Sequence, residues 1–508
     1  MLLSLVSSTK LMKLYIEILD TRHQTLFKYF LNAHHTGGHM SITICPNALG
    51  DSNFLADHGV RLAYVVGGMV KAIGSKAIVE RMASAKLLSF FGAGGMSASA
   101  IEETVSGLAA KLGTELPWGV NFLHNFVLPE AEEVVVDILL NHNVRRVEAS
   151  AFIIPTPALA RWRLLGLSVA PDGAIRRQHQ VMAKLSRGEV ARSFLAPVEP
   201  EIVANLLSRG DINDEQAKLA ELVPLCDDIV VEADSGGHTD KRVALALLPA
   251  IRRQRDDIVQ RFKPASNVRI GLAGGLGSPE AIAAAFMLGA DFVMTGSINQ
   301  ATVEAGTSDL AKDMLQKVGP QDCDMAPAGD MFEIGTKIQV LRRGSMFAAR
   351  GNRLYELYRS LDSLDQIPQR ERKEIEEKCM GRSLEEVWKE TASYYARVAP
   401  NELEEAEVNP KKKMAMVFRW YFIHSNRLTL EGDSSKKSNF QIHCGPAMAA
   451  CNAWLAGTSI ENWRQRHVDD IADKLMTEAS SYILHKITTW ENNAIVDSSI
   501  TSPGQQNL

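Results

Sequence analysis

The sequence has few cysteines, and their spacing follows no recognisable pattern. No two of them form a C-x-x-C pair, and no regular framework connects them. The six are Cys45, Cys226, Cys323, Cys379, Cys444 and Cys451. A disulfide scaffold needs evenly paired cysteines in a short chain, so this class is excluded. The cysteine content favours a reduced, cytoplasmic protein.

The sequence also lacks a long apolar run, a secretion signal and an excess of basic residues. No uninterrupted run of about 18 apolar residues occurs, so we expect no membrane span. The opening MLLSLV is too short for the apolar part of a secretion signal, because Lys10 and Lys13 interrupt the apolar residues after it. A basic excess is also lacking, since the net charge is −5 and the isoelectric point is near 6.3. Nucleic acid is therefore not an expected partner.

The chain does have a soluble globular composition and a repeated α/β rhythm. It has 508 residues, 46% of them hydrophobic and 23% charged, which suits one large barrel plus a second element. From about residue 60, short β-branched or apolar runs alternate with helical patterns, as in parallel βαβ units. The eight predicted strands are 61–66, 86–91, 118–122, 144–150, 180–185, 228–233, 268–274 and 291–297. Eight such strands favour a TIM barrel, in which the first and last strands pair, over an open sheet.

The remaining segments predict an insertion and further domains. SVAPDGAIRRQ reads as a hairpin before the fifth strand, and two extra helical segments, EPEIVANLLSRG and NDEQAKLAELV, come after that strand. Past residue 340 the patterns are helical and rich in aromatic residues. We expect a poorly defined N-terminal extension at 1–41, a barrel at 42–339, a C-terminal helical domain at 340–490 and a tail at 491–508.

The N-terminal extension predicts no binding site. LMKLYIEILDTRHQTLFKYF would form an amphipathic helix or reflect a misplaced start, and it carries no functional motif. His34, His35 and His39 come next, but no carboxylate or cysteine completes a ligand set. We therefore expect a loop with solvated histidines and no metal.

Glycines gather where the predicted strands end, which is the active-site face of a TIM barrel. The segments are GGM (Gly67, Gly68, Met69), GAGGMS at 92–97, DSGGHTD at 234–240, AGGLGSP at 273–279 and TGSINQ at 295–300. Loops after strands seven and eight bind phosphate in many TIM barrels, because free backbone N–H groups and a helix N-terminus favour an anion. The candidate phosphate-binding residues are Gly274, Gly275, Gly277, Thr295, Gly296 and Ser297. The alternative is that these glycines only make tight turns.

A phosphate site combined with glycines after strands one, two and six suits a flat cofactor across the barrel mouth, and FMN has that shape. Glycines at 67 and 68, beside Met69, would let the backbone pass close to the flavin ring. Asn121 and Lys184, in strands three and five, are candidates for its polar edge. For Lys184 a surface position is an equal alternative.

The same motifs resemble a known family. GGM, FFGAGGMS, GVNF, EADSGGHTD, GGLGSPEA and TGSINQA resemble the flavin-dependent nitronate monooxygenase and enoyl-reductase barrels. Further segments include DMFEIGTKIQVLRRGSMF, KMAMVFRWY and CGPAMAACNAW. They are similar to one branch, the trans-acting enoyl reductases of polyunsaturated fatty acid and polyketide synthesis. The resemblance spans about residues 42–480.

The resemblance implies an activity and a catalytic residue. The chain would be an NAD(P)H-dependent flavoprotein enoyl reductase, using FMN and NADPH or NADH. Gly236 and Gly237 would pass near the flavin, and His238 would face the substrate, unless it is an exposed loop histidine. A nitronate monooxygenase is the alternative enzyme, and a flavin- or phosphate-binding scaffold is a non-enzymatic alternative.

The resemblance also implies a partner, an acidic acyl carrier protein or carrier domain that holds the substrate. The segment QVLRRGSMFAARGNRLYELYR has five arginines and one acid, and three lysines lie further on at 411–413. This basic excess would steer a carrier, whereas pairing with acids elsewhere in the fold is an equal alternative. The oligomeric state stays open, with a homodimer as one expectation.

Overall fold

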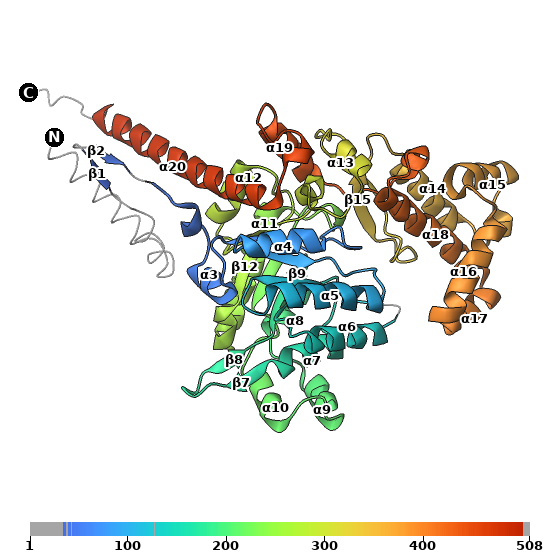
Figure 1. Ribbon diagram of the computed structural model, residues 1–508, viewed down its shortest axis with the longest axis horizontal. Helices are drawn as coiled ribbons and strands as arrows, with labels where there is room; N and C mark the ends of the chain where they lie inside the picture. The colour runs from blue at the N-terminus through green and yellow to red at the C-terminus, as the bar shows by residue number, and fades with distance from the viewer. Residues whose placement is uncertain (1–33, 37–38, 42, 126–127, 501–508) are drawn as a thin grey trace, which may run out of the picture.

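The computed structural model describes residues 34–36, 39–41, 43–125 and 128–500 (Figure 1). The helix expected within residues 11–30 lies outside this part of the chain. His34–Thr36 (β1) and His39–Ser41 (β2) pair as a short antiparallel hairpin, so the histidine-rich segment is not simply a loop.

A closed barrel of eight parallel strands forms the centre of the molecule. Its strands are β3 (Tyr64–Val66), β4 (Leu88–Phe91), β5 (Trp118–Leu123), β6 (Arg146–Ser150), β9 (Gln180–Leu185), β10 (Asp228–Glu232), β12 (Arg269–Ala273) and β13 (Val293–Thr295). Each falls within or overlaps one of the eight predicted strands, and β13 pairs with β3 to close the barrel. The predicted TIM barrel is confirmed.

Helices surround the barrel and cover the apolar outer faces of its strands (Figure 1). They are α4 (Lys76–Ser84), α5 (Ala98–Leu112), α6 (Glu130–Asn141), α7 (Pro157–Leu165), α8 (Gly188–Leu195), α11 (Ala244–Val259) and α12 (Pro279–Met287), whereas α3 (Ser52–His58) packs through Phe54 against a separate cluster that includes Phe292. Short 3-10 turns are η1 (Pro46–Ala48), η2 (Lys263–Asn267) and η3 (Ser297–Ala301). Hydroxyl side chains begin several of these helices; Ser278, for example, accepts a hydrogen bond from the backbone N–H of Ala281.

The predicted insertions are present on the side of the barrel away from the active-site face. Leu167–Val169 (β7) and Ile175–Arg177 (β8) form the expected hairpin. The helices α9 (Pro200–Ser208) and α10 (Asp214–Ala220) come after β9 as predicted. This arrangement keeps the insertions clear of the strand ends that carry the glycines.

A small antiparallel sheet lies at the carboxyl ends of the barrel strands. It consists of β11 (Gly237–His238), β15 (Lys337–Leu341) and β14 (Cys323–Pro327), in that order, and α13 (Asp309–Leu315) comes before β14 in the chain. The sheet was not predicted. It matters for function because β11, directly after β10, is tied by β15 to the segment that leads into the helical region.

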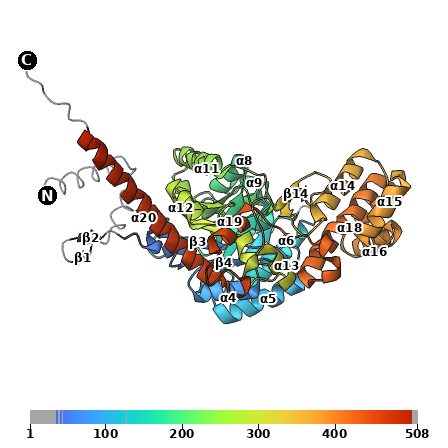
Figure 2. The same ribbon diagram turned by 90° about the horizontal axis from the view of Figure 1, so that it is seen from above.

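The helical region has a core of its own beside the barrel (Figure 2). Its elements are α14 (Phe347–Ser360), η4 (Leu364–Gln366), α15 (Gln369–Ile375), the π-helical turn η5 (Glu376–Met380), α16 (Leu384–Val398), α17 (Pro400–Val408), α18 (Pro410–Glu431) and η6 (Ser434–Asn439). Phe332 contacts the rings of Tyr355, Phe418 and Phe422 in this core. The predicted C-terminal helical region is confirmed.

The last helices return to the barrel. They are α19 (Pro446–Leu455), the short turn η7 (Trp463–Gln465) and α20 (Val468–Ile500). Figures 1 and 2 show α20 running past α12 and α4, on the side of the barrel opposite to α15–α17. Leu475 and Met476 of α20 are buried with the barrel helices rather than with the helical region. A division of the chain into domains at residue 339 stays a prediction. None of the described helices is both long and apolar enough to cross a membrane.

Candidate active site

The carboxyl ends of the barrel strands open into one cavity of about 680 Å³. Its floor is formed by the glycine-rich loops, and one wall comes from the helical region through Arg419, Phe422, Ile423 and Asn426 of α18. The expected location of the site is therefore observed, but part of its wall comes from residues beyond the barrel.

The cavity brings together twelve of the thirteen predicted cofactor-binding residues and His238. These twelve are Gly67, Gly68, Met69, Asn121, Lys184, Gly236, Gly237, Gly274, Gly275, Thr295, Gly296 and Ser297. Gly277 is not among the lining residues. A Cβ atom at Gly277 would lie 1.9 Å from the backbone oxygen of Ala447, so this glycine lets α19 pack closely against the loop. The close approach of α19 therefore accounts for a glycine at position 277, and no contact with a cofactor is needed.

The corner between β12 and β13 is open to an anion. At Gly275, which has a φ of +75°, and at Gly296, an added Cβ would meet no atom within 4 Å. The N-terminus of α12 begins just after this corner, with Ser278 as its cap. Thr295 is already engaged, because its Oγ1 lies 2.5 Å from the hydroxyl of Tyr64 and also accepts from Asn299. Backbone amides and Ser297 are therefore the candidate donors at this corner.

The opposite part of the floor is a hydrogen-bonded cluster around a fully buried carboxylate, Glu148. Its Oε2 accepts from the backbone N–H of Gly68 at 2.8 Å and from Asn121 Nδ2 at 2.9 Å. Its Oε1 lies 3.3 Å from Nζ of Lys184. Burial lowers the pKa of Lys184, but Glu148 and Glu232 outweigh burial and raise the pKa above its ordinary value. Lys184 is thus a charged donor at the cavity surface.

Glu148 was missed by sequence reasoning as a functional residue. The signal that could have found it is an acid at the centre of a strand, VRRVEAS, whose neighbours on either side are apolar. The cluster fixes the side chain of Asn121, whose Nδ2 also donates to Ser150 Oγ at 2.9 Å. Its Oδ1 is buried and has no hydrogen-bond partner among the described residues. This leaves one unsatisfied acceptor beside one charged donor at the cavity floor.

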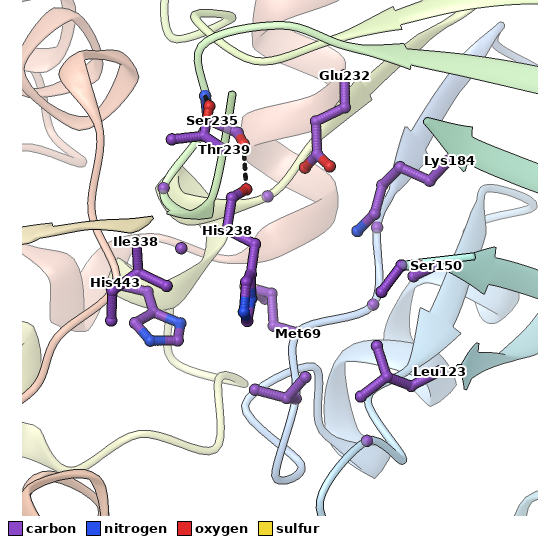
Figure 3. A pocket seen from close by; sticks show the side chains of 18 of the residues that line it. Met69, Leu123, Ser150, Lys184, Glu232, Ser235, His238, Thr239, Ile338 and His443 are labelled. Carbon is purple, nitrogen blue, oxygen red and sulfur yellow. Dashed lines mark hydrogen bonds between the residues drawn. The ribbon is translucent and has the colours of Figure 1, made fainter. Parts of the chain in front are cut away.

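His238 also lines the cavity, and its side chain is 45% exposed (Figure 3). Its Nε2 lies 2.9 Å from Oδ1 of Asp330, which comes from the loop between β14 and β15. Burial lowers the pKa of His238, but the hydrogen bond and charge of Asp330 outweigh burial and raise it. The imidazole is therefore held toward its protonated form, and its Nε2 is engaged by Asp330.

Asp330 and two further residues on this wall, Lys71 and His443, were also missed. Lys71 and Ala72 come directly after Val70 with positive φ values of 55° and 57°, a conformation that non-glycine residues adopt at a cost. His443 lies in the segment between η6 and α19 and lines the cavity near His238. Asp330 and His443 reach the cavity from loops outside the barrel-strand pattern, so the sequence alone could not place them. Lys71 follows the predicted GGM loop, but no motif singled it out.

The fold and the site define a TIM-barrel protein with a glycine-lined active-site cavity. A family model described as the inserted helical domain of [acyl-carrier-protein] S-malonyltransferase matches residues 361–440. In the solved structures, the chain is similar to the enoyl reductase domain of MlnA from the macrolactin biosynthesis cluster of Bacillus amyloliquefaciens. The two share 37% identity and a TM-score of 0.84, over 87% of this chain and 99% of that one. FabK from Thermotoga maritima shares 17% identity with a TM-score of 0.52, over 86% of this chain and 98% of that one, which shows the fold alone.

Two relatives identified by their sequences support the same similarity. The polyketide biosynthesis protein PksE of Bacillus subtilis is 45% identical over 87% of this chain and 57% of its own length. One of the polyunsaturated fatty acid synthase proteins of a Thraustochytrium species is 40% identical over 81% of this chain and 28% of its own length. The chain thus spans little more than half, or less, of these relatives. It belongs to the family of enoyl reductase barrels of polyketide and polyunsaturated fatty acid biosynthesis, which includes the MlnA domain. This confirms the resemblance predicted from the motifs.

Proposed function

We propose that this protein is an NAD(P)H-dependent flavoprotein that reduces the 2,3 double bond of enoyl thioesters held on an acyl carrier protein. The observation that carries this proposal is one cavity with a cofactor-sized, glycine-lined floor on one side and a carboxylate-held imidazole, His238, on the other. Family membership supports the reaction type, since the MlnA domain of the same family is an enoyl reductase.

The residues of the floor fit FMN. The open amides of Gly275 and Gly296 would bind the phosphate at the start of α12. At Gly68 an added Cβ would lie 2.5 Å from Cβ of Asn121, so a side chain there would disrupt the floor under the ring. Flavin has both N–H and C=O groups on its polar edge. The unpartnered Oδ1 of Asn121 and Nζ of Lys184 are a matching acceptor and donor.

The chain's own residues would orient the substrate and supply the proton. Bound FMN, once reduced by NADPH or NADH, would supply a hydride to Cβ of the enoyl thioester. His238 would give the proton on Nδ1 to Cα, while its Nε2–H stays bonded to Asp330. The sequence has no separate nicotinamide-binding motif, so the nicotinamide and the enoyl thioester would use the cavity in turn.

An anaerobic titration tests the function and separates it from its alternatives. We expect NADPH to bleach the flavin absorbance, and crotonyl thioester to restore it without oxygen. Restoration by oxygen alone would make the protein a nitronate monooxygenase-type oxygenase. A flavin that NADPH does not bleach would indicate a scaffold. Purification without any flavin would overturn both enzyme functions and leave only a phosphate-binding scaffold.

A further inference from the structure

A second histidine, His443, lies beside His238 in the cavity although the two are far apart in the sequence (Figure 3). Its backbone is fixed in place from two sides. Its carbonyl oxygen accepts from Nε2 of Gln300 at 2.6 Å, and the residue forms an antiparallel bridge with Val340 of β15. His443 is thus held by the same sheet that holds His238.

The hydrogen bonds of His443 select one tautomer. Nε2 of its ring lies 2.9 Å from the amide nitrogen Nε2 of Gln441. With the Gln441 amide in this orientation its nitrogen can only donate, so Nε2 of His443 accepts and Nδ1 carries the hydrogen. Gly237 faces Nδ1, and an added Cβ there would come within 3.2 Å of it. The absence of a side chain at Gly237 leaves this N–H accessible.

The two histidines differ in protonation. Burial, followed by the positive charges of His238 and Lys71, lowers the pKa of His443 to about 4, while Asp330 opposes this shift. Asp330 instead raises the pKa of His238, to which it is bonded. At neutral pH His443 is therefore a neutral imidazole, and beside it lies a second imidazole, His238, whose pKa is raised toward the protonated form. Two neighbouring groups with separated pKa values are typical of a divided acid–base role.

We propose that His443 is a second catalytic residue, whose Nδ1–H donates a hydrogen bond to the thioester carbonyl oxygen of the enoyl substrate. This rests on the proposed enoyl reduction. As hydride reaches Cβ, the double-bond electrons move toward the carbonyl and give an enolate oxygen. His443 stabilises that oxygen and keeps its own proton, while His238 supplies the proton that forms the Cα–H bond. A donor fixed before the reaction is effective because no reorganisation is needed.

The first test measures carbonyl polarisation without turnover. Crotonyl thioester labelled with ¹³C at the carbonyl is bound to the oxidised protein with no nicotinamide present. We expect a downfield carbonyl shift in the wild type, its loss in His443→Leu, and its partial return in His443→Asn, whose Nδ2 can replace the Nδ1–H. His424→Leu is the matched control, because His424 stacks on Trp420 outside the cavity lining.

The second test separates the two half-reactions. His443→Leu should leave flavin reduction by NADPH unchanged and slow reoxidation by crotonyl thioester by about 100-fold, the usual scale for a lost oxyanion donor. Imidazole ¹⁵N NMR of the wild type should show a neutral ring protonated at Nδ1. If His443→Leu does not fold, Gln441→Leu replaces it. This variant removes the hydrogen bond that fixes the tautomer of His443, so carbonyl polarisation and the reoxidation rate should both fall, but by less than with loss of the imidazole itself.

Two outcomes overturn the inference. One is a carbonyl shift and reoxidation rate in His443→Leu equal to those of the wild type. The other is an Nε2-protonated ring in the NMR spectrum. Failure of the wild type itself to be reoxidised by crotonyl thioester would instead overturn the proposed function, so the two failures are distinguishable.

Discussion

At the scale of single residues, the site depends on which positions tolerate a side chain and which charges face each other. The floor of the cavity has open space at Gly275 and Gly296, and its wall holds His238 in contact with Asp330. Each feature can be tested with a single substitution. The control for each is the same substitution at a residue outside the cavity lining.

Gly275→Asp should yield protein without flavin, because the new carboxylate would repel the phosphate and fill its corner. Gly210→Asp is a matched control: both glycines have a φ of +75° and open space around them, so the backbone strain is alike, but Gly210 does not line the cavity. The measurement is the visible flavin absorbance of each purified variant. A fully loaded Gly275→Asp protein would place the phosphate elsewhere.

Asp330→Asn should move the alkaline limb of the pH profile to lower pH. In the wild type the raised pKa keeps His238 protonated, so the rate with enoyl thioester falls only as pH rises through that raised value. Without the carboxylate, burial and Lys184 lower the pKa of His238 and only Glu232 opposes them. His238 therefore loses its proton at a lower pH. A displacement of one pH unit would correspond to about a tenfold loss on the alkaline side.

The profile of kcat/KM against pH measures this displacement. Asp324→Asn, an exposed aspartate of β14 outside the cavity lining, serves as the control and should leave the profile unchanged. An unmoved alkaline limb in Asp330→Asn would mean that His238 is not the proton donor.

At the scale of elements, ion pairs account for part of the basic segment before and within α14. Arg343 pairs with Asp322 at 3.3 Å, and Arg353 pairs with Glu356 and Glu371. Lys412 pairs with Glu402 and Glu405. These cations are thus neutralised within the fold, which was the alternative to carrier binding. Arg342, which donates to a backbone oxygen, and Arg359 have no ion-pair partner among the described residues.

Arg342 and Arg359 are therefore the cations of this segment best placed to attract an acidic carrier. Reversal of both to glutamate should lower kcat/KM for a carrier-bound enoyl substrate by about tenfold at low salt, since long-range attraction sets the association rate. The loss should shrink at high salt. The activity with a small crotonyl thioester should not change.

The matched control reverses Arg176 and Lys218, on β8 and α10 at the opposite end of the barrel (Figure 1). This control should leave both activities unchanged. Equal loss on carrier-bound and small substrates in the Arg342/Arg359 variant would place these arginines in the fold or at the cofactor rather than at a carrier surface.

At the scale of the whole molecule, the barrel and the C-terminal segment depend on each other. The chain leaves the barrel after β13, builds the helical region, supplies His443 to the cavity, and returns as α19 and α20 to the outside of the barrel. Leu475 of α20 is fully buried in the same cluster as Ile282 of α12. The C-terminal helix therefore contributes to the stability of the barrel.

Leu475→Ala should destabilise the protein by about 2–5 kcal/mol, because it removes buried methyl groups and leaves a cavity between α20 and α12. Leu245→Ala, at a side chain that is 65% exposed on α11, should change the free energy of unfolding by less than about 0.5 kcal/mol. Urea unfolding followed by tryptophan fluorescence compares the two. Equal stability of both variants would show that α20 is dispensable for the barrel.

The sequence by itself determined the barrel and the floor of its cavity. Eight strand patterns alternate with helices, and the period of the apolar residues fixes which segments become strands. Parallel strands place their carboxyl ends on one face, so Gly67, Asn121, Lys184 and Gly275 had to meet there. The sequence also contained the EADSGGHTD motif that places His238 after β10.

Only the tertiary structure decided the opposite wall of the cavity and the charge state of its groups. Asp330 reaches His238 across 92 residues of sequence, and His443 arrives from beyond the helical region. No periodic pattern encodes such contacts, since they depend on how the sheet of β11, β15 and β14 folds over the barrel. The pKa of each histidine depends on these neighbours and on burial, which exist only once the chain has folded.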